Sequence, residues 1–208
     1  DTVKKRQWEV RAETARDLEG FVAEHGDVVV EYSLYPALLI ALTTPFLREQ
    51  VRRTPGAPVS FDTTYDISSD GLKLSMFVVS ALSLEKRFVP FLACIHRRLD
   101  ADLYRRIFYL FFSLFGLFGS LPTSFSGMTV DFADAIRSGY ISAWVEYAGH
   151  SNPGPGSLRS SFLEEAMKRI RLCKFHFLKG ILTFLRSGGT TSVTQHRAVE
   201  LAKTLLSA

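Results

Sequence analysis

In the first 57 residues the hydrophobic pattern changes from helix-like to strand-like and back to helix-like. From Val3 to about His25, apolar residues recur among charged ones at the spacing of an amphipathic helix. The run VVVEYSLY at 28–35 predicts a short strand, and the apolar spacing of 37–53 predicts a second helix that is interrupted or restarts at Pro45. We therefore expect residues 1–57 to form a helical N-terminal arm.

Three strand-like segments follow this arm. Residues 59–67, 72–82 and 87–96 are rich in apolar, β-branched and aromatic side chains, as strands are. The turn sequences SSDG at 68–71 and SLEK at 83–86 separate them. Strands joined by such short connections pair as an antiparallel meander.

The rest of the chain alternates between helical and strand-like patterns. Asp100 can cap a helix over 101–116, because its carboxylate can accept hydrogen bonds from the first turn. The later elements are expected at 128–132 (strand), 133–149 (helix), 158–168 (helix), 169–177 (strand, or strand passing into helix), 178–188 (helix) and 195–208 (helix). A meander followed by alternating strands and helices predicts an α/β domain with a mixed sheet over 58–208. That order matches the RNase H-like fold, with the domain either truncated or interrupted by a helical insertion after about residue 187.

One apolar segment raises the question of a membrane span. No charged residue occurs from Ile107 to Val130, and the dense apolar part, 107–121, is 15 residues long. A spanning helix needs about 20 such residues, so we expect a helix buried in a soluble core and no membrane partner. A membrane-associated helical protein is the alternative that this segment leaves open.

Composition and charge narrow the class of protein. The chain is 47% apolar and 22% charged, which is typical of a globular domain and not of a disordered one. Its 2 cysteines, Cys94 and Cys173, are too few for a disulfide framework and favour a reducing compartment. From Ser151 onward there are 9 basic residues against 3 acidic ones. This asymmetry favours a polyanionic partner, nucleic acid first, although a solvated basic face gives the same pattern.

Two aspartates on predicted strands carry the candidate chemistry. Asp62 lies in the first strand of the meander, and Asp131 ends the first strand after the long helix. In an RNase H-like arrangement these strands are neighbours, so the two carboxylates would repel each other unless a divalent cation lay between them. Two such ions about 3.5–4 Å apart can activate a water or a 3′-hydroxyl at a phosphodiester. Oxygen ligands favour Mg²⁺ or Mn²⁺ over zinc. Alternatively each aspartate caps a turn or a helix, Asp131 as a simple N-cap.

A thiol and an imidazole form a second candidate ligand set. Cys173 and His176 are ligands of the zinc type, but two ligands make only half of a site. Cys94 and His96 could provide the other half, and the sequence does not show whether the pairs meet. The alternatives are a buried cysteine with a hydrogen-bonded histidine, or a catalytic Cys–His pair, for which no third orienting residue is evident.

Four segments of the chain resemble the eukaryotic Mutator-like (MULE) transposases, which cut DNA with a DDE triad on an RNase H-like fold. They are TTPFLREQVRR (43–53), the strand FDTTYDI with Asp62, TVDFADAIRSG (129–139) with Asp131, and CKFHFLKGI (173–181), which is similar to the family's Cys-x-x-His block. The resemblance implies a nuclear enzyme that cleaves transposon ends by phosphodiester hydrolysis and joins the freed 3′-hydroxyl to target DNA by transesterification. It also implies Mg²⁺ as cofactor and a homo-oligomeric assembly.

The resemblance further implies a third acid, a glutamate on a helix after the Cys-x-x-His block. Glu200 is the only glutamate downstream of that block, and it shares a helix face with His196 and Lys203, as a solvent-exposed residue also would. Glu164 and Glu165 precede the block. Should the third acid be missing, the alternative is a transposase-derived module that binds DNA or protein without catalysis.

Basic residues complete the set of candidates. Lysine and arginine contacts to phosphates would position DNA without reading its sequence, and a solvated surface charge is the alternative for each residue. The candidates for phosphate contacts are Arg97, Arg98, Arg159, Lys168, Arg169, Arg171, Lys174, Lys179 and Arg186.

Overall fold

The fold was analysed in a computed structural model of the chain. The structure describes residues 17–53, 56–64, 71–81, 87–115, 127–131, 133–151, 158–188 and 191–207. The start of the predicted N-terminal helix and most residues of the two meander turns lie outside these ranges, whereas residues 17–24 are helical as predicted.

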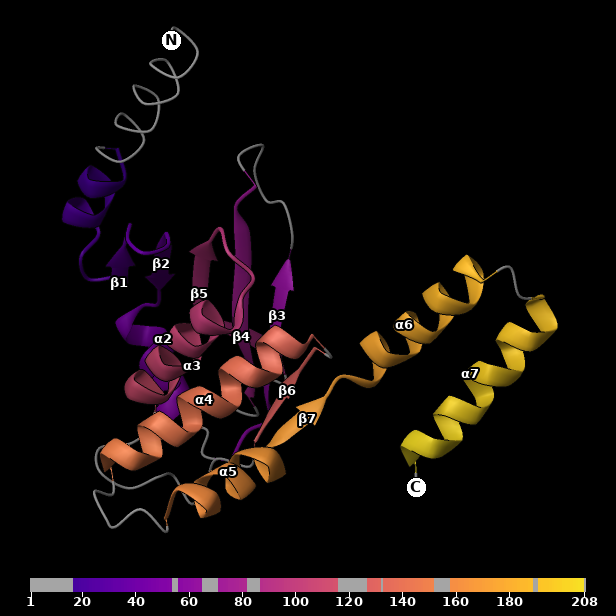
Figure 1. Cartoon of the computed structure of the whole chain (residues 1–208). Helices are drawn as coiled ribbons and strands as arrows, with labels where there is room; N and C mark the ends of the chain where they lie inside the picture. The colour runs from indigo at the N-terminus through magenta and orange to yellow at the C-terminus, as the bar shows by residue number, and fades with distance from the viewer. Residues whose placement is uncertain are drawn as a thin grey trace, which may run out of the picture.

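Seven strands form one mixed sheet in the order β1-β2-β5-β4-β3-β6-β7 (Figure 1). The strands are β1 (Val29–Ser33), β2 (Leu39–Leu42), β3 (Val59–Thr64), β4 (Lys73–Ala81), β5 (Arg87–His96), β6 (Met128–Val130) and β7 (Ile170–Leu172). β3, β4 and β5 pair antiparallel in sequence order, and β6 and β7 continue the sheet in parallel on the other side of β3. The α/β class, the mixed sheet and the three-strand meander are therefore confirmed.

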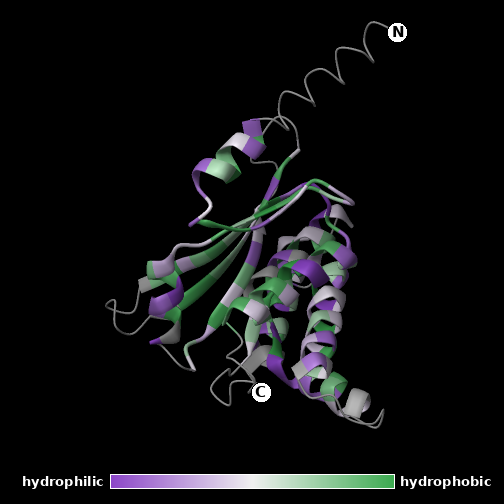
Figure 2. Cartoon of the chain, turned by 90° about the vertical axis from the view of Figure 1, so that its left-hand side faces the viewer, coloured by the Kyte–Doolittle hydropathy of each residue, from purple (hydrophilic) through white to green (hydrophobic). Residues whose placement is uncertain are grey.

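The helices fall into a packed layer and a projecting pair. They are α2 (Pro45–Arg52), α3 (Ala101–Phe115), α4 (Asp134–Ser151), α5 (Leu158–Arg169), α6 (Lys174–Ser187) and α7 (Ser192–Ser207). α3 and α4 lie together on one face of the sheet, as the view from the β1 edge shows (Figure 2). α6 and α7 pack against each other and extend away from the sheet beyond the end of β7 (Figure 1).

The prediction of a helix from residue 37 is wrong. Leu39–Leu42 form strand β2, which pairs with β5, and α2 begins only at Pro45. Leu39, Ile40 and Ala41 are all buried, so the strand lacks the alternation that distinguishes a strand from a helix in sequence. Thr44 caps α2 by accepting a hydrogen bond from the Leu47 N–H at 3.1 Å. β1 confirms the strand predicted at 28–35, and with β2 the region expected to be a helical arm contributes two strands to the sheet.

Aromatic side chains fill the layer between the sheet and its helices. The rings of Phe61 and Phe108 lie 4.6 Å apart, and those of Phe77 and Phe111 stack at 4.7 Å. Residues 107–115 of the apolar segment that suggested a membrane span belong to helix α3, which packs into this core, and residues 116–121 lie outside the described ranges. Among the described residues, no helix has the length and hydrophobicity needed to cross a bilayer.

A glycine sets how closely α3 and α4 cross. A Cβ atom on Gly139 would lie 2.5 Å from the Tyr104 Cβ and 2.9 Å from the Arg105 backbone nitrogen. Neither contact is possible without moving a helix, so the crossing requires glycine at this position of α4.

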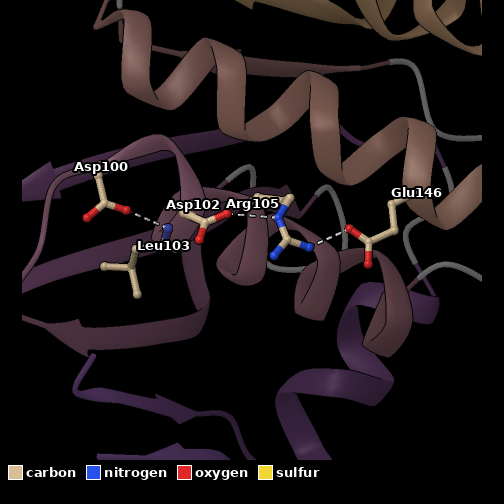
Figure 3. A network of polar contacts seen from close by, with 5 residues as sticks. All are labelled: Asp100, Asp102, Leu103, Arg105 and Glu146. Atoms are coloured by element: carbon tan, nitrogen blue, oxygen red, sulfur yellow. Dashed lines mark hydrogen bonds and ion pairs between the residues drawn. The ribbon is translucent and has the colours of Figure 1, made fainter. Parts of the chain in front are cut away.

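Polar contacts fix the start of α3 and tie it to α4 (Figure 3). The Asp100 carboxylate accepts a hydrogen bond from the Leu103 N–H at 3.0 Å, which confirms the predicted cap. Further along α3, the Arg105 guanidinium donates to Glu146 of α4 at 2.6 Å and to Asp102 at 3.3 Å. The hydrogen bond with Glu146 is the main reason that the pKa of Arg105 is raised.

Candidate functional site

The strands that carry Asp62 and Asp131 are neighbours in the sheet. β3 pairs in parallel with β6, and Ser60 stands opposite Thr129. This is the last pair of the two strands, and Asp62 and Asp131 each follow it by two residues, at the carboxyl ends of the paired segments. Neighbouring strands lie about 4.8 Å apart, so the two backbone positions are close. The expectation that these two strands lie side by side is confirmed.

Both aspartates belong to the sheet face that is turned away from α3. In β3, Phe61 and Thr63 are buried against α3, whereas Asp62 is exposed, in the alternation of a strand. In β6, Val130 is buried in the same core, so the next residue, Asp131, belongs to the opposite face. This explains how a strand in the centre of the sheet carries a carboxylate: Asp62 keeps its contact with solvent and avoids the penalty of burial.

Cys173 extends this arrangement to a third strand. Val130 pairs with Leu172 of β7, and the Cys173 N–H donates to the Val130 carbonyl at 2.8 Å. Cys173 is therefore level with Asp131, and it is also the N-cap residue of α6. Asp62, Asp131 and Cys173 are called the edge row below. Across the described ranges, no three His, Cys, Asp or Glu side chains are grouped so that they could hold a metal ion.

The alternative role of Asp131 as a simple helix N-cap does not hold. α4 begins at Asp134, and the Arg137 N–H donates to the Ala133 carbonyl at 3.1 Å. That bond gives the N-cap position to Ala133, two residues after Asp131.

Glu200, the predicted third acid, lies on α7 away from the edge row. Its carboxylate accepts a hydrogen bond from Lys203 at 2.8 Å, which lowers the pKa of Glu200. α7 packs against α6, and both helices extend away from the sheet (Figure 1). The structure does not bring Glu200 to Asp62 and Asp131, so the expected triad is not assembled from the described residues.

The two Cys–His pairs do not form one zinc site. β5 carries Cys94 and His96, and three strands separate it from β7, which leads into Cys173. At about 4.8 Å per strand the pairs are roughly 19 Å apart. Cys94 is fully buried, and burial raises the pKa of its thiol. For His176 the structure describes only the backbone, within α6.

His96 belongs instead to a buried chain of hydrogen bonds. The Tyr104 hydroxyl donates to Thr63 Oγ1 at 3.4 Å, and Thr63 Oγ1 lies 2.8 Å from Ser75 Oγ. Ser75 Oγ lies 2.7 Å from His96 Nε2, and His96 Nδ1 lies 2.8 Å from the Arg98 carbonyl oxygen. A carbonyl only accepts, so Nδ1 carries the proton and Nε2 accepts from Ser75. Ser75 then accepts a hydrogen bond from Thr63, so every hydroxyl in the chain donates toward His96.

This hydrogen-bond chain is structural and holds the strand that bears Asp62. Burial is the main reason that the pKa of His96 is lowered, and nearby Lys73 lowers it further. The Ser75–His96 contact has the geometry of an activated nucleophile, but both residues are fully buried and out of reach of a substrate. The chain links β3, β4, β5 and α3. Its signal in the sequence is a pair of hydroxyl residues, Thr63 and Ser75, at inward strand positions that stand opposite each other.

Three of the predicted phosphate contacts are engaged in ion pairs within the protein. Arg98 pairs with Asp100, and Lys168 pairs with Glu164 at 2.7 Å. The Arg169 side chain is 22% exposed and pairs with Glu165 at 2.7 Å, with its guanidinium 5.0 Å from the centre of the Trp144 ring. Arg169 therefore serves mainly to pack α5 on α4.

The other predicted phosphate contacts are placed differently. Arg97 is exposed at the end of β5, and Lys179 is exposed on α6. Arg171 stands opposite Thr129 and is exposed on the same sheet face as the edge row. For Lys174 only the backbone is described, in the first turn of α6.

The edge row can offer two hard oxygen ligands on adjacent strands at a solvent-accessible sheet face. This ligand set fits Mg²⁺ or Mn²⁺, and these ions do not favour a thiol such as that of Cys173. Comparison with protein-family models, curated proteins and solved structures gives no match for the chain. The site itself and the sequence resemblance are therefore what indicates a function for this chain.

Proposed function

We propose that this chain is the RNase H-like core of a DDE-type transposase, which cleaves DNA and joins DNA strands with a divalent metal. One observation supports this most: β3, which carries Asp62, pairs in parallel with β6, which directly precedes Asp131. The sheet order agrees, because β3 lies between the antiparallel meander and the parallel strands β6 and β7. The MULE-like segments around both aspartates point to the same class.

In this proposal Asp62 and Asp131 hold Mg²⁺ or Mn²⁺. A cation bound there would supply Lewis-acid activation of a water or a 3′-hydroxyl and neutralise charge at the phosphodiester. The hydrogen-bond chain beneath Asp62 anchors the adjacent Thr63 to β4, β5 and α3, and thereby holds the strand rigid. From the family resemblance we also propose a nuclear location and a homo-oligomer. Light scattering of the purified protein tests the oligomeric state.

A nicking assay tests the proposal. Supercoiled DNA is incubated with the purified chain and Mn²⁺, and we expect nicking that Asp62→Asn abolishes. The matched control is Asp134→Asn, because Asp134 is an exposed aspartate close to Asp131 that pairs with Arg137. The control should nick like the wild type. Nicking that persists in Asp62→Asn contradicts the assignment.

A second candidate is a transposase-derived module that binds DNA without cutting it. It is favoured by the observation that the described residues contain no third acid beside Asp62 and Asp131. It predicts salt-sensitive DNA binding that neither Asp62→Asn nor a chelator changes. Metal-dependent cleavage by the wild type rejects this candidate.

A further inference from the structure

The positive charge of the last third of the chain is concentrated after α5. On α5, Lys168 pairs with Glu164 at 2.7 Å, and Arg169 pairs with Glu165 at 2.7 Å, so these two basic residues are compensated within the helix. From β7 onward the sequence has six basic residues and one acidic residue, Glu200. The basic residues of this segment are Arg171, Lys174, Lys179, Arg186, Arg197 and Lys203.

Three of these basic residues are exposed on the two projecting helices. Lys179 and Arg186 lie seven positions apart on α6, so they share a helix face about 10 Å apart along its axis. Arg197 lies on α7, and all three side chains are exposed. Within the described ranges, no carboxylate forms an ion pair with Lys179, Arg186 or Arg197, in contrast to the basic residues of α5.

The projecting helices begin where the edge row ends. Cys173, the last member of the row, is the N-cap residue of α6, so this helix leads away from the sheet directly beside Asp131 (Figure 1). α6 has 14 residues, which gives a length of about 21 Å, or roughly six base pairs of duplex. A duplex that reaches the edge row can therefore continue along α6.

We propose that α6 and α7 form an arm that binds the phosphate backbone of double-stranded DNA, with Lys179, Arg186 and Arg197 as its contacts. The choice of DNA as the partner rests on the proposed function. The arm holds the duplex by charge and does not read its sequence, because phosphates carry no base information. Each neutralised phosphate releases counterions, so the affinity falls as the salt concentration rises.

Fluorescence anisotropy with a labelled duplex of about 20 base pairs tests the arm, with salt varied from about 50 to 200 mM. The variant Lys179→Gln/Arg186→Gln/Arg197→Gln should bind at least tenfold more weakly at about 50 mM salt. Its slope of log affinity against log salt should be shallower by about 2–3, at about 0.9 per lost contact. The control is Arg53→Gln, because Arg53 is also exposed but is paired with Glu49. It should behave like the wild type.

Three outcomes overturn the arm. In the first, the triple variant keeps the affinity and salt slope of the wild type while its circular dichroism is unchanged. In the second, the wild type does not bind the duplex. In the third, the wild type binds polyglutamate as tightly as it binds the duplex at the same salt concentration. Asp62→Asn separates the arm from the catalytic proposal, since this variant should bind duplex as the wild type does. A wild type that binds DNA through the three residues but never cleaves it keeps the arm and rejects the metal-dependent enzyme.

Discussion

Asp62 and Asp131 each lie two residues beyond Ser60 and Thr129, the last pair of the parallel strands β3 and β6, and Asp62 is exposed on the sheet face turned away from α3. The relationship follows from the pairing of Ser60 with Thr129 two residues earlier, and from the alternation of side chains along each strand. The Asp62 carboxylate is exposed to solvent there, and Asp131 is half-buried. A site built in this way requires β3 to keep its register with β6. The residues that pack around β3 therefore also support the site.

The α3–α4 crossing should not tolerate a methyl group at Gly139. A Cβ there would lie 2.5 Å from the Tyr104 Cβ, so we expect Gly139→Ala to destabilise the fold by about 1–3 kcal/mol. Gly149 is a matched control on the same helix, because a Cβ there meets nothing within 4 Å. Gly149→Ala should be neutral or stabilising by up to about 1 kcal/mol. Urea denaturation measures both, and equal stability of the two variants rejects the close crossing.

The hydrogen-bond chain through His96 should make stability depend on pH. Burial lowers the pKa of His96 in the folded protein from its ordinary 6.5, so the unfolded chain binds the proton first as the pH falls. Stability is therefore complete above pH 6.5 and decreases below it, by at most about 1.4 kcal/mol per pH unit. The neighbouring charged group is Lys73 on β4, and the Tyr104 ring of α3 faces the imidazole.

Two histidine variants isolate this effect in urea titrations at several pH values. His96→Asn should lose the pH dependence assigned to His96, and it should be less stable at pH 8 by about 1–3 kcal/mol because Ser75 loses its acceptor. His150→Asn is the control, since His150 is exposed on α4. An undiminished pH dependence in His96→Asn shows that the protonation of His96 is not coupled to folding.

The two cysteines should differ strongly in reactivity. Cys94 is fully buried in the sheet and its thiol pKa is raised by burial, whereas Cys173 is partly exposed at the start of α6. Because the thiolate is the reactive form, an alkylating reagent should modify Cys173 at least about 100-fold faster than Cys94 in the native protein. Mass spectrometry of the Cys173→Ser variant provides the control and should show almost no labelling. Rapid labelling of Cys94 contradicts its burial.

The sequence predicted the elements whose patterns are local. β3 to β5 alternate or carry β-branched and aromatic residues between turn sequences, and α3 has a capping aspartate, so the meander and the long helix could be predicted. β2 could not, because Leu39, Ile40 and Ala41 are buried on both faces and show no period. An N-terminal arm was therefore expected where two further strands extend the sheet.

The candidate site was only partly predictable for a similar reason. The pairing of β3 with β6 follows from the order of elements, and it makes the strand that carries Asp62 the neighbour of the strand that precedes Asp131, as expected. The hydrogen-bond chain joins residues 12, 21 and 41 positions apart, which meet only in one register of the sheet. The position of Glu200 depends on how α6 leaves β7, and local patterns do not specify that direction.

Manganese binding measured by titration calorimetry tests the central claim most directly, because it requires neither DNA nor catalysis. The account predicts that the wild type binds Mn²⁺, and that Asp62→Asn and Asp131→Asn each weaken binding roughly tenfold or more by removing a charged oxygen ligand. Asp134→Asn should leave the affinity unchanged. Wild-type Mn²⁺ affinity in both Asp62→Asn and Asp131→Asn, or no binding by the wild type, contradicts a shared metal site at the edge row.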